Sequence, residues 1–193
     1  IKTPLRLLED AKNRFDYTLA VANAAAPVST ADLYFQASKS GNSITFRAPT
    51  SNGGSPDQTY TLQPNSYQID YRVASNNLQS VLVSNKLQFQ WDNYLDKLEK
   101  NQTYERTMSS VYYKINDKGS DYCNCQKDDR DETGEQPVKW FAHSNQFFNT
   151  AIVAQDFSFR DFVGETHVYD FTNPEHIAIA TASGESAGGG CGG

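Results

Sequence analysis

The sequence has no long apolar run and few cysteines, and each lack excludes a class of protein. No apolar run in the 193 residues approaches the ~20 that a membrane-spanning helix needs, so no transmembrane segment is predicted. The three cysteines are Cys123, Cys125 and Cys191, and the first two are separated by a single residue. An odd number at this spacing does not predict a disulfide framework.

An excess of positive charge is also missing. The 17 Lys and Arg residues are scattered among 23 Asp and Glu residues, which gives a formal net charge of −6. Binding to nucleic acid or to anionic lipid head groups needs clustered positive charge, so we expect neither partner. The chain begins at Ile1 without a signal-peptide pattern, and we interpret it as a mature secreted protein or a piece of a longer one.

Aromatic residues are plentiful, with 11 Tyr, 11 Phe and 2 Trp, and many of them alternate with polar residues. This period of two is typical of strands with one face on a core and one in water. It recurs at residues 15–21, 43–47, 58–62, 67–73 and 87–91. Turn residues such as Gly41-Asn42 and Pro64-Asn65 separate these runs and favour antiparallel hairpins. The sequence therefore predicts an all-β sandwich or stack of antiparallel sheets.

Other segments carry weaker patterns. Trp91, Tyr94, Leu95 and Leu98 have the spacing of one face of a short helix. Residues 116–136 are polar and charged, which predicts a long exposed loop, whereas residues 138–153 predict two core strands. We expect one domain over residues 1–182, followed by a Gly/Ala/Ser-rich tail, tag or linker at 183–193.

No motif predicts a catalytic, cofactor or metal site. Cys123 and Cys125 with one of three histidines give at most three zinc ligands where a structural site needs four; the histidines are His143, His167 and His176. We interpret the remaining carboxylate groups as solvated charges, namely Asp92, Asp96 and Glu99 and the run at residues 128–132. We therefore predict no catalytic residues, no cofactor and no metal.

Aromatic side chains are the remaining candidate for function. Tyr112, Tyr113, Trp140 and Phe141 are the predicted partner-contact residues, and Tyr122, Phe147 and Phe148 lie near them in sequence. Aromatics at strand spacing more often belong to a core than to a surface. Any of these rings that are exposed would suit a protein or sugar partner.

Three segments, in order along the chain, resemble the large periplasmic domain of YidC-type membrane protein insertases. They are TYTLQPNSYQIDY at 59–71; Trp91 with YER at 104–106 and VYY at 111–113; and VKWF at 138–141 with NQFF at 145–148 and IVA at 152–154. The resemblance runs from about Leu5 to Ala154. It weakens after Asp156, and we expect the sequence to start after the opening strands of the family domain.

This resemblance implies an antiparallel β-supersandwich related to galactose mutarotases, with one or two short helices. It implies a periplasmic domain of a protein of the inner membrane, acting in protein transport and as a chaperone that inserts and folds membrane proteins. The implied role of the domain is accessory and non-enzymatic. Its implied partners are Sec translocon accessory subunits and nascent membrane proteins.

Two alternatives stay open. A sugar-binding or mutarotase-like enzyme would need a histidine and a carboxylate as acid and base, and His143 or His167 with Asp156 or Glu165 are the available members. A carbohydrate- or peptide-binding module would instead need a line of exposed aromatics or a free edge strand.

Overall fold

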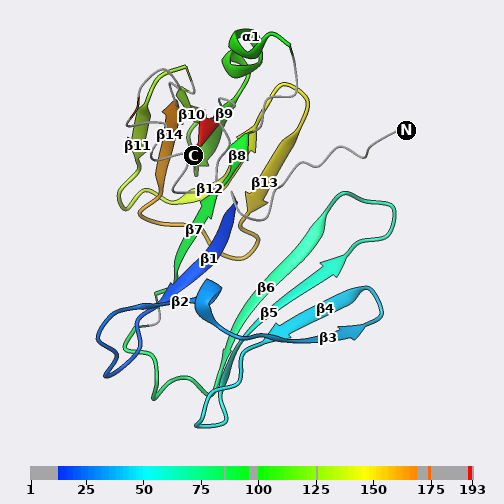
Figure 1. Cartoon of the computed structure of the whole chain (residues 1–193), viewed down its shortest axis with the longest axis vertical. Coiled ribbons are helices and arrows are strands. Elements are labelled where there is room, and N and C mark those ends of the chain that lie inside the picture. The colour runs from blue at the N-terminus through cyan, green and yellow to red at the C-terminus, as the bar shows by residue number, and fades with distance from the viewer. Residues whose placement is uncertain are drawn as a thin grey trace. The chain divides into compact units, whose positions relative to one another are not determined.

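The computed structural model describes residues 13–84, 86–95, 100–124, 126–168, 174 and 191–192. The chain forms two compact units, one made by Phe15–Gln90 and one made mainly by the chain from Trp91 onward (Figure 1). Among the described residues, strands dominate, and the helical elements are the short helix α1 (Gln102–Thr107) and the 3-10 turn η1 (Thr30–Asp32). Their strand pairings are antiparallel, which confirms the predicted all-β class.

The first unit holds two sheets. Strands β1 (Arg14–Leu19) and β2 (Val28–Ser29) form a three-stranded sheet with β7 (Gln88–Asp92), in the order β2-β1-β7. The boundary between the two units falls within β7, after Gln90. A four-stranded sheet follows the chain order, with β3 (Gln36–Ser40), β4 (Ser43–Arg47), β5 (Ser55–Leu62) and β6 (Ile69–Asn76). The predicted turn at Gly41 joins β3 to β4 with a φ of 56°, and Asn65 joins β5 to β6 with a φ of 53°. Both residue types accept this left-handed conformation readily.

Aromatic rings form a packed cluster in this unit. Tyr71 on β6 lies 4.6 Å from Tyr60 between ring centroids, and Phe15 of β1 meets it edge-on at 5.5 Å. Phe15 in turn contacts Phe89 of β7 at 4.9 Å. The Tyr71 hydroxyl donates to Gln58 Oε1 at 3.0 Å, which satisfies it inside the packed rings. Burial is the main reason why the pKa of Tyr71 is raised.

The opposite face of this sheet is polar. Cross-strand hydroxyl pairs join Ser43 to Thr61 at 2.7 Å and Thr45 to Thr59 at 2.9 Å. Arg47 donates to both carboxylate oxygens of Asp57. The alternation read from the sequence is therefore a real two-sided pattern, with rings on one face and hydroxyls on the other.

The second unit also holds two sheets. One has the order β10-β9-β12-β13, and the other has the order β11-β14-β15-β8. Their bounds are β8 (Tyr94–Leu95), β9 (Ser110–Ile115), β10 (Ser120–Asn124), β11 (Asp129–Glu132), β12 (Val138–Ser144), β13 (Asn149–Val153), β14 (Val163–Val168) and β15 (Cys191–Gly192). The two core strands predicted for residues 138–153 are confirmed as β12 and β13.

The predicted helix around residues 91–98 is wrong over its described part. Trp91 lies in β7, and Tyr94 and Leu95 form β8, while Leu98 is outside the described residues. A run of two or three turns has little helical stability of its own, and Trp91 instead packs on Phe141 at 5.9 Å between ring centroids. The α-helix begins later, where the Asn101 side chain accepts a hydrogen bond from Tyr104 N at 3.1 Å.

The predicted loop over residues 116–136 is also wrong, because β10 and β11 occupy much of it. Their backbones pair with β9 and β14, so charged side chains do not prevent strand formation. Arg130 on β11 forms ion pairs with Glu132 and Glu165. Within the predicted tail, Cys191–Gly192 form the short strand β15 between β14 and β8. The rest of residues 183–193 lie outside the described residues.

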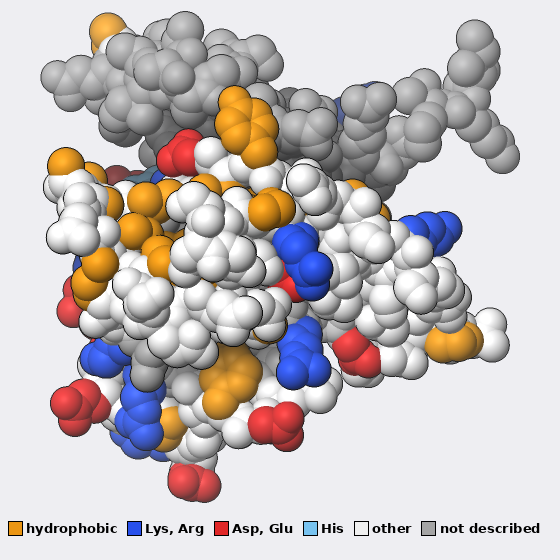
Figure 2. Space-filling model, turned by 90° about the horizontal axis from the view of Figure 1, so that it is seen from below, with side chains coloured by type: hydrophobic (Ala, Val, Ile, Leu, Met, Phe, Trp, Pro, Cys, Tyr) orange, Lys and Arg blue, Asp and Glu red, His pale blue; other side chains and the backbone are white. Residues whose placement is uncertain are grey.

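Charged side chains on the face shown in Figure 2 are mixed in sign. Lys and Arg side chains lie interspersed with Asp and Glu and with uncharged groups, and apolar side chains form separate spots between them. The predicted scatter of charge along the sequence thus persists on this face of the folded chain.

Candidate functional site

The sheet β10-β9-β12-β13 has two faces with different side chains, and it contains all four predicted partner-contact residues. Opposed residues on antiparallel strands share a face. Tyr122, Tyr112, Ala142 and Ala151 form one row across the four strands, so their side chains lie on one face. Tyr113 and Phe141 are also opposed, and they lie on the other face.

Tyr113 and Phe141 belong to the core. Their exposed fractions are 5% and 7%. The rings of Tyr113 and Phe141 lie 4.9 Å and 5.4 Å from that of Phe162, and Phe141 also contacts Phe159 at 5.0 Å. Little of either side chain is therefore accessible to a partner.

Tyr112 and Trp140 lie on the outer face and are half-buried. The ring of Tyr112 is 5.5 Å from that of Tyr122, whose side chain is 54% exposed. Trp140 is opposed to Val153, which is 56% exposed at the edge of the sheet. We name these four residues, Tyr112, Tyr122, Trp140 and Val153, the outer aromatic face. Sequence reasoning found its aromatic members but not the division between the two faces, which depends on strand register.

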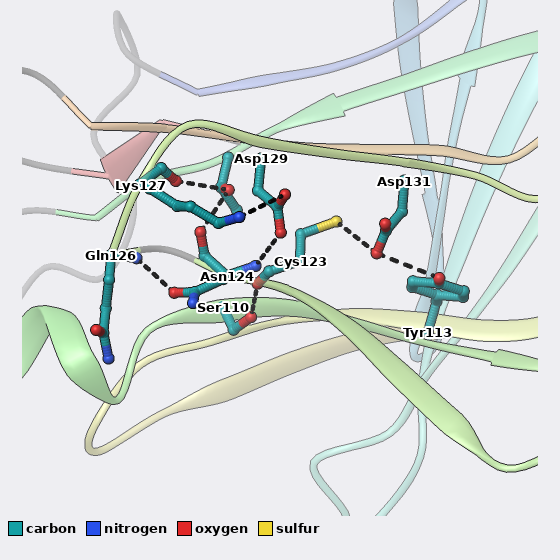
Figure 3. A network of polar contacts seen from close by, with 9 residues as sticks. Ser110, Tyr113, Cys123, Asn124, Gln126, Lys127, Asp129 and Asp131 are labelled. Carbon is teal, nitrogen blue, oxygen red and sulfur yellow. Dashed lines mark hydrogen bonds and ion pairs between the residues drawn. The ribbon is translucent and has the colours of Figure 1, made fainter.

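A network of polar contacts links side chains of β9, β10 and β11 (Figure 3). Cys123 is fully buried, and its thiol donates to Asp131 Oδ2 at 3.5 Å. The Tyr113 hydroxyl donates to the same carboxylate oxygen at 3.3 Å. Burial, with the Asp131 charge adding to it, raises the pKa of the Cys123 thiol to about 12. The thiol is therefore protonated at neutral pH and is a poor nucleophile.

Hydrogen bonds and an ion pair of the same network hold the ends of the connection between β10 and β11. Asn124 N donates to Asp129 Oδ2 at 2.9 Å, and the Thr166 hydroxyl donates to Asn124 O at 3.0 Å. Lys127 Nζ lies 3.6 Å from Asp129 Oδ1. Gly164 is needed beside this network, because a Cβ at this position would lie 2.9 Å from Cys123 Sγ. The sequence did not reveal the half-buried Asp131 or the buried Gly164, since a charged run and a lone glycine carry no signal of burial.

Of the histidines and carboxylates that the enzyme alternative needs, only His167 and Glu165 lie close together. His143 is buried on the core face, and its ring meets that of Trp91 edge-on at 4.2 Å. Burial lowers the pKa of His143 to about 4, although a hydrogen bond with the Trp91 backbone acts in the opposite direction. No carboxylate of the described residues contributes to this shift of the pKa. His167 Nε2 lies 3.5 Å from Glu165 Oε2, but its side chain is 51% exposed. Asp156 is exposed.

Within the residues that the structure describes, no group of three or more His, Cys, Asp or Glu side chains could hold a metal ion. Cys125, His176, Asp96 and Glu99 lie outside those residues. A search of the same residues for a helix long and apolar enough to cross a membrane also found none.

Several known proteins similar to this chain are named as insertases. The profile of the YidC periplasmic domain family matches residues 2–186. Proteins named membrane protein insertase YidC are 29% identical over 79% of this chain in Parabacteroides distasonis and 29% identical over 80% in Phocaeicola vulgatus. The relative from Chlorobium luteolum is 30% identical over 79% of the chain.

The chain spans about a quarter of the length of these relatives, 24%, 25% and 28% respectively. No solved structure matches it with comparable significance. The profile match covers far more than half of the 193 residues, including both compact units, and its description agrees with the predicted periplasmic location. This chain belongs to the YidC periplasmic domain family.

Proposed function

We propose that this chain is the periplasmic domain of a membrane protein insertase of the inner membrane, and that its role there is accessory and non-enzymatic. The observation that carries the proposal is the profile match over residues 2–186, together with relatives that bear the insertase name. Residues 1–182 act as one domain in this proposal. Its partners are Sec accessory subunits or translocated segments of nascent membrane proteins.

The outer aromatic face is the proposed contact surface. Tyr and Trp side chains supply large contact areas at low entropic cost and are enriched where proteins meet. Tyr122 at 54% exposure and Val153 at 56% are accessible, and half-buried Tyr112 and Trp140 lie between them on the same sheet. Lys114, opposed to Trp140, adds a positive charge beside the rings.

The buried histidine supports the non-enzymatic part of the proposal. A general acid or base has to reach substrate with a pKa near the working pH. His143 is enclosed by the core and has its pKa lowered to about 4. We therefore expect the protein not to accelerate the interconversion of aldose anomers above the rate in buffer. An acceleration that the variant His167→Asn abolishes would establish the enzyme alternative instead.

Photo-crosslinking in the full-length protein tests the contact surface. A benzoylphenylalanine at Tyr122 should form adducts with Sec subunits or with a nascent membrane protein. The matched control is the same probe at Tyr67, which is fully exposed in the other unit. Equal yields of crosslinked adduct at both positions, or adducts at Tyr67 alone, would refute the proposed contact surface. The family assignment would still hold in either case.

A further inference from the structure

The hairpin that joins β5 to β6 ends in a surface without charge. Residues 58–69 form the end of β5, the turn and the start of β6, and they contain no Asp, Glu, Lys, Arg or His. Leu62 and Ile69 are the last opposed pair of the two strands, and they are 59% and 54% exposed. Tyr67 in the turn is fully exposed. The turn lies away from β1, β2 and β7, so these strands leave it uncovered (Figure 1).

The first charged residue after this stretch, Asp70, is engaged by amide groups of the turn itself. Gln68 Nε2 donates to Asp70 Oδ1 at 2.8 Å, and Gln63 Nε2 donates to Asp70 Oδ2. Gln68 N also donates to Ser66 Oγ at 3.0 Å. The carboxylate is therefore satisfied inside the hairpin, and these bonds hold the turn in one conformation. A surface that is ordered before binding loses less entropy when a partner covers it.

The exposed pair at the hairpin end continues the apolar face of the sheet. Residues two apart along a strand share a face, so Leu62 and Ile69 lie on the same face as Tyr60 and Tyr71. Those two rings are half-buried, and Tyr71 packs on Phe15 of β1. The apolar face thus extends beyond the packed rings to the turn, where more than half of each aliphatic side chain meets solvent.

The size and charge of this surface decide between partners. Three exposed side chains offer a few hundred Å², whereas a stable protein interface buries about 800 Å² on each partner. A second copy of the chain is also disfavoured, because each copy carries a net charge of −6. The interfacial zone of a lipid bilayer, by contrast, takes up small apolar groups and is enriched in tyrosine.

The missing charge also selects the kind of lipid. The turn has no Lys or Arg to attract anionic head groups, and the chain as a whole is acidic. Backbone groups of a turn need water or head groups as partners, which limits insertion to the interfacial zone. We infer that the β5–β6 turn, with Leu62, Tyr67 and Ile69, lies in the interfacial zone of a zwitterionic bilayer. This inference rests on the proposed function, since the parent membrane protein brings the domain to a bilayer.

Fluorescence quenching in the full-length parent tests this contact. The parent is reconstituted into phosphatidylcholine vesicles with dansylalanine in place of Tyr67, and the vesicles contain lipid with a nitroxide near the head group. The matched control carries the probe in place of Tyr34, which is 95% exposed in the same compact unit. Quenching should be at least about twofold stronger at Tyr67 than at Tyr34. A nitroxide at the end of the acyl chain should quench neither probe.

A charge at the hairpin end gives a second readout. Leu62→Glu should abolish quenching of the probe at Tyr67, because a carboxylate is costly to place in the interfacial zone. Val83→Glu is the matched control, since Val83 is 67% exposed in the same unit, and it should leave quenching unchanged. Both positions are exposed, so neither variant should shift the thermal midpoint appreciably.

Several results would overturn the inference. Absent quenching at Tyr67, or equal quenching at Tyr67 and Tyr34, would do so. Quenching that grows with the share of anionic lipid would show that another, charged surface makes the contact. A blue-shifted probe at Tyr67 that no lipid nitroxide quenches would show that protein covers the turn. In all these cases the proposed function would stand, whereas a parent that alkaline carbonate extracts from membranes would refute the proposed function itself.

Discussion

Gly164 on β14 should tolerate no side chain, and Gly164→Ala is the most direct test of the packing around Cys123. A Cβ built at Gly164 lies 2.9 Å from Cys123 Sγ and 3.1 Å from Phe162 Cε1. The thiol is fully buried and donates a hydrogen bond to Asp131, and the centroid of the Phe162 ring lies 4.9 Å from that of Tyr113. Neither neighbour can move away freely, so we expect the substitution to lower the free energy of unfolding by about 1–3 kcal/mol.

Urea unfolding followed by tryptophan fluorescence measures this loss, because both tryptophans, Trp91 and Trp140, lie in the same compact unit as Gly164. In a thermal scan the midpoint should fall by about 2–4 °C for each kcal/mol. Gly119→Ala is the matched control, since a Cβ at Gly119 meets no atom within 4 Å. It should change stability by less than about 0.5 kcal/mol.

A double-mutant cycle isolates the contact between Gly164 and Cys123. Cys123→Ala alone should cost about 1–2 kcal/mol, because it leaves a cavity. In the double variant the new Cβ occupies space that the sulfur has left, so the combined loss should be smaller than the sum by about 1 kcal/mol or more. Losses that simply add would show that the sulfur and the glycine do not constrain each other, and the packing argument would be wrong.

Three further predictions concern protons. His143 has a pKa of about 4 in the folded state and 6.5 in the unfolded chain, so between these values the unfolded state binds one more proton. The free energy of unfolding should therefore fall by about 3 kcal/mol as the pH drops from 6.5 to 4. His143→Phe should remove this pH dependence in urea titrations. The Arg47 hydrogen bond lowers the pKa of Asp57, so its stabilisation is present above the unfolded pKa of 3.8 and lost as the pH falls through the folded pKa; Asp57→Asn should lose this acid dependence. In a variant whose other two cysteines are serine, Cys123 at pH 8 should react with maleimide roughly a thousandfold more slowly when folded than in urea, because its pKa is about 12.

Sequence patterns predicted the fold best where one face of a strand is apolar and the other polar. From Ile69 onward the run predicted at residues 67–73 forms β6, in which Tyr71 and Val73 lie on the face of the rings and Arg72 is exposed on the opposite face. The same reasoning failed for β10 and β11, whose core-facing members include Cys123 and Asp131. Those groups satisfy one another across strands far apart in the sequence, so their burial depends on pairing that a local pattern cannot reveal.

The register of β9 against β12 decides which of the predicted aromatic residues can serve a partner. Tyr112 and Tyr113 are neighbours in sequence and look equivalent there, yet pairing with Ala142 and Phe141 sends their side chains to opposite faces. A slip of one residue would bury Tyr112 and expose Tyr113. The buried contact of Tyr113 with Asp131 and Phe162 therefore stabilises the register that leaves Tyr112 on the outer face. Tyr113→Phe, which keeps the ring and removes the hydroxyl, should preserve crosslinking from Tyr122, whereas Tyr113→Ser should weaken it by loosening that register.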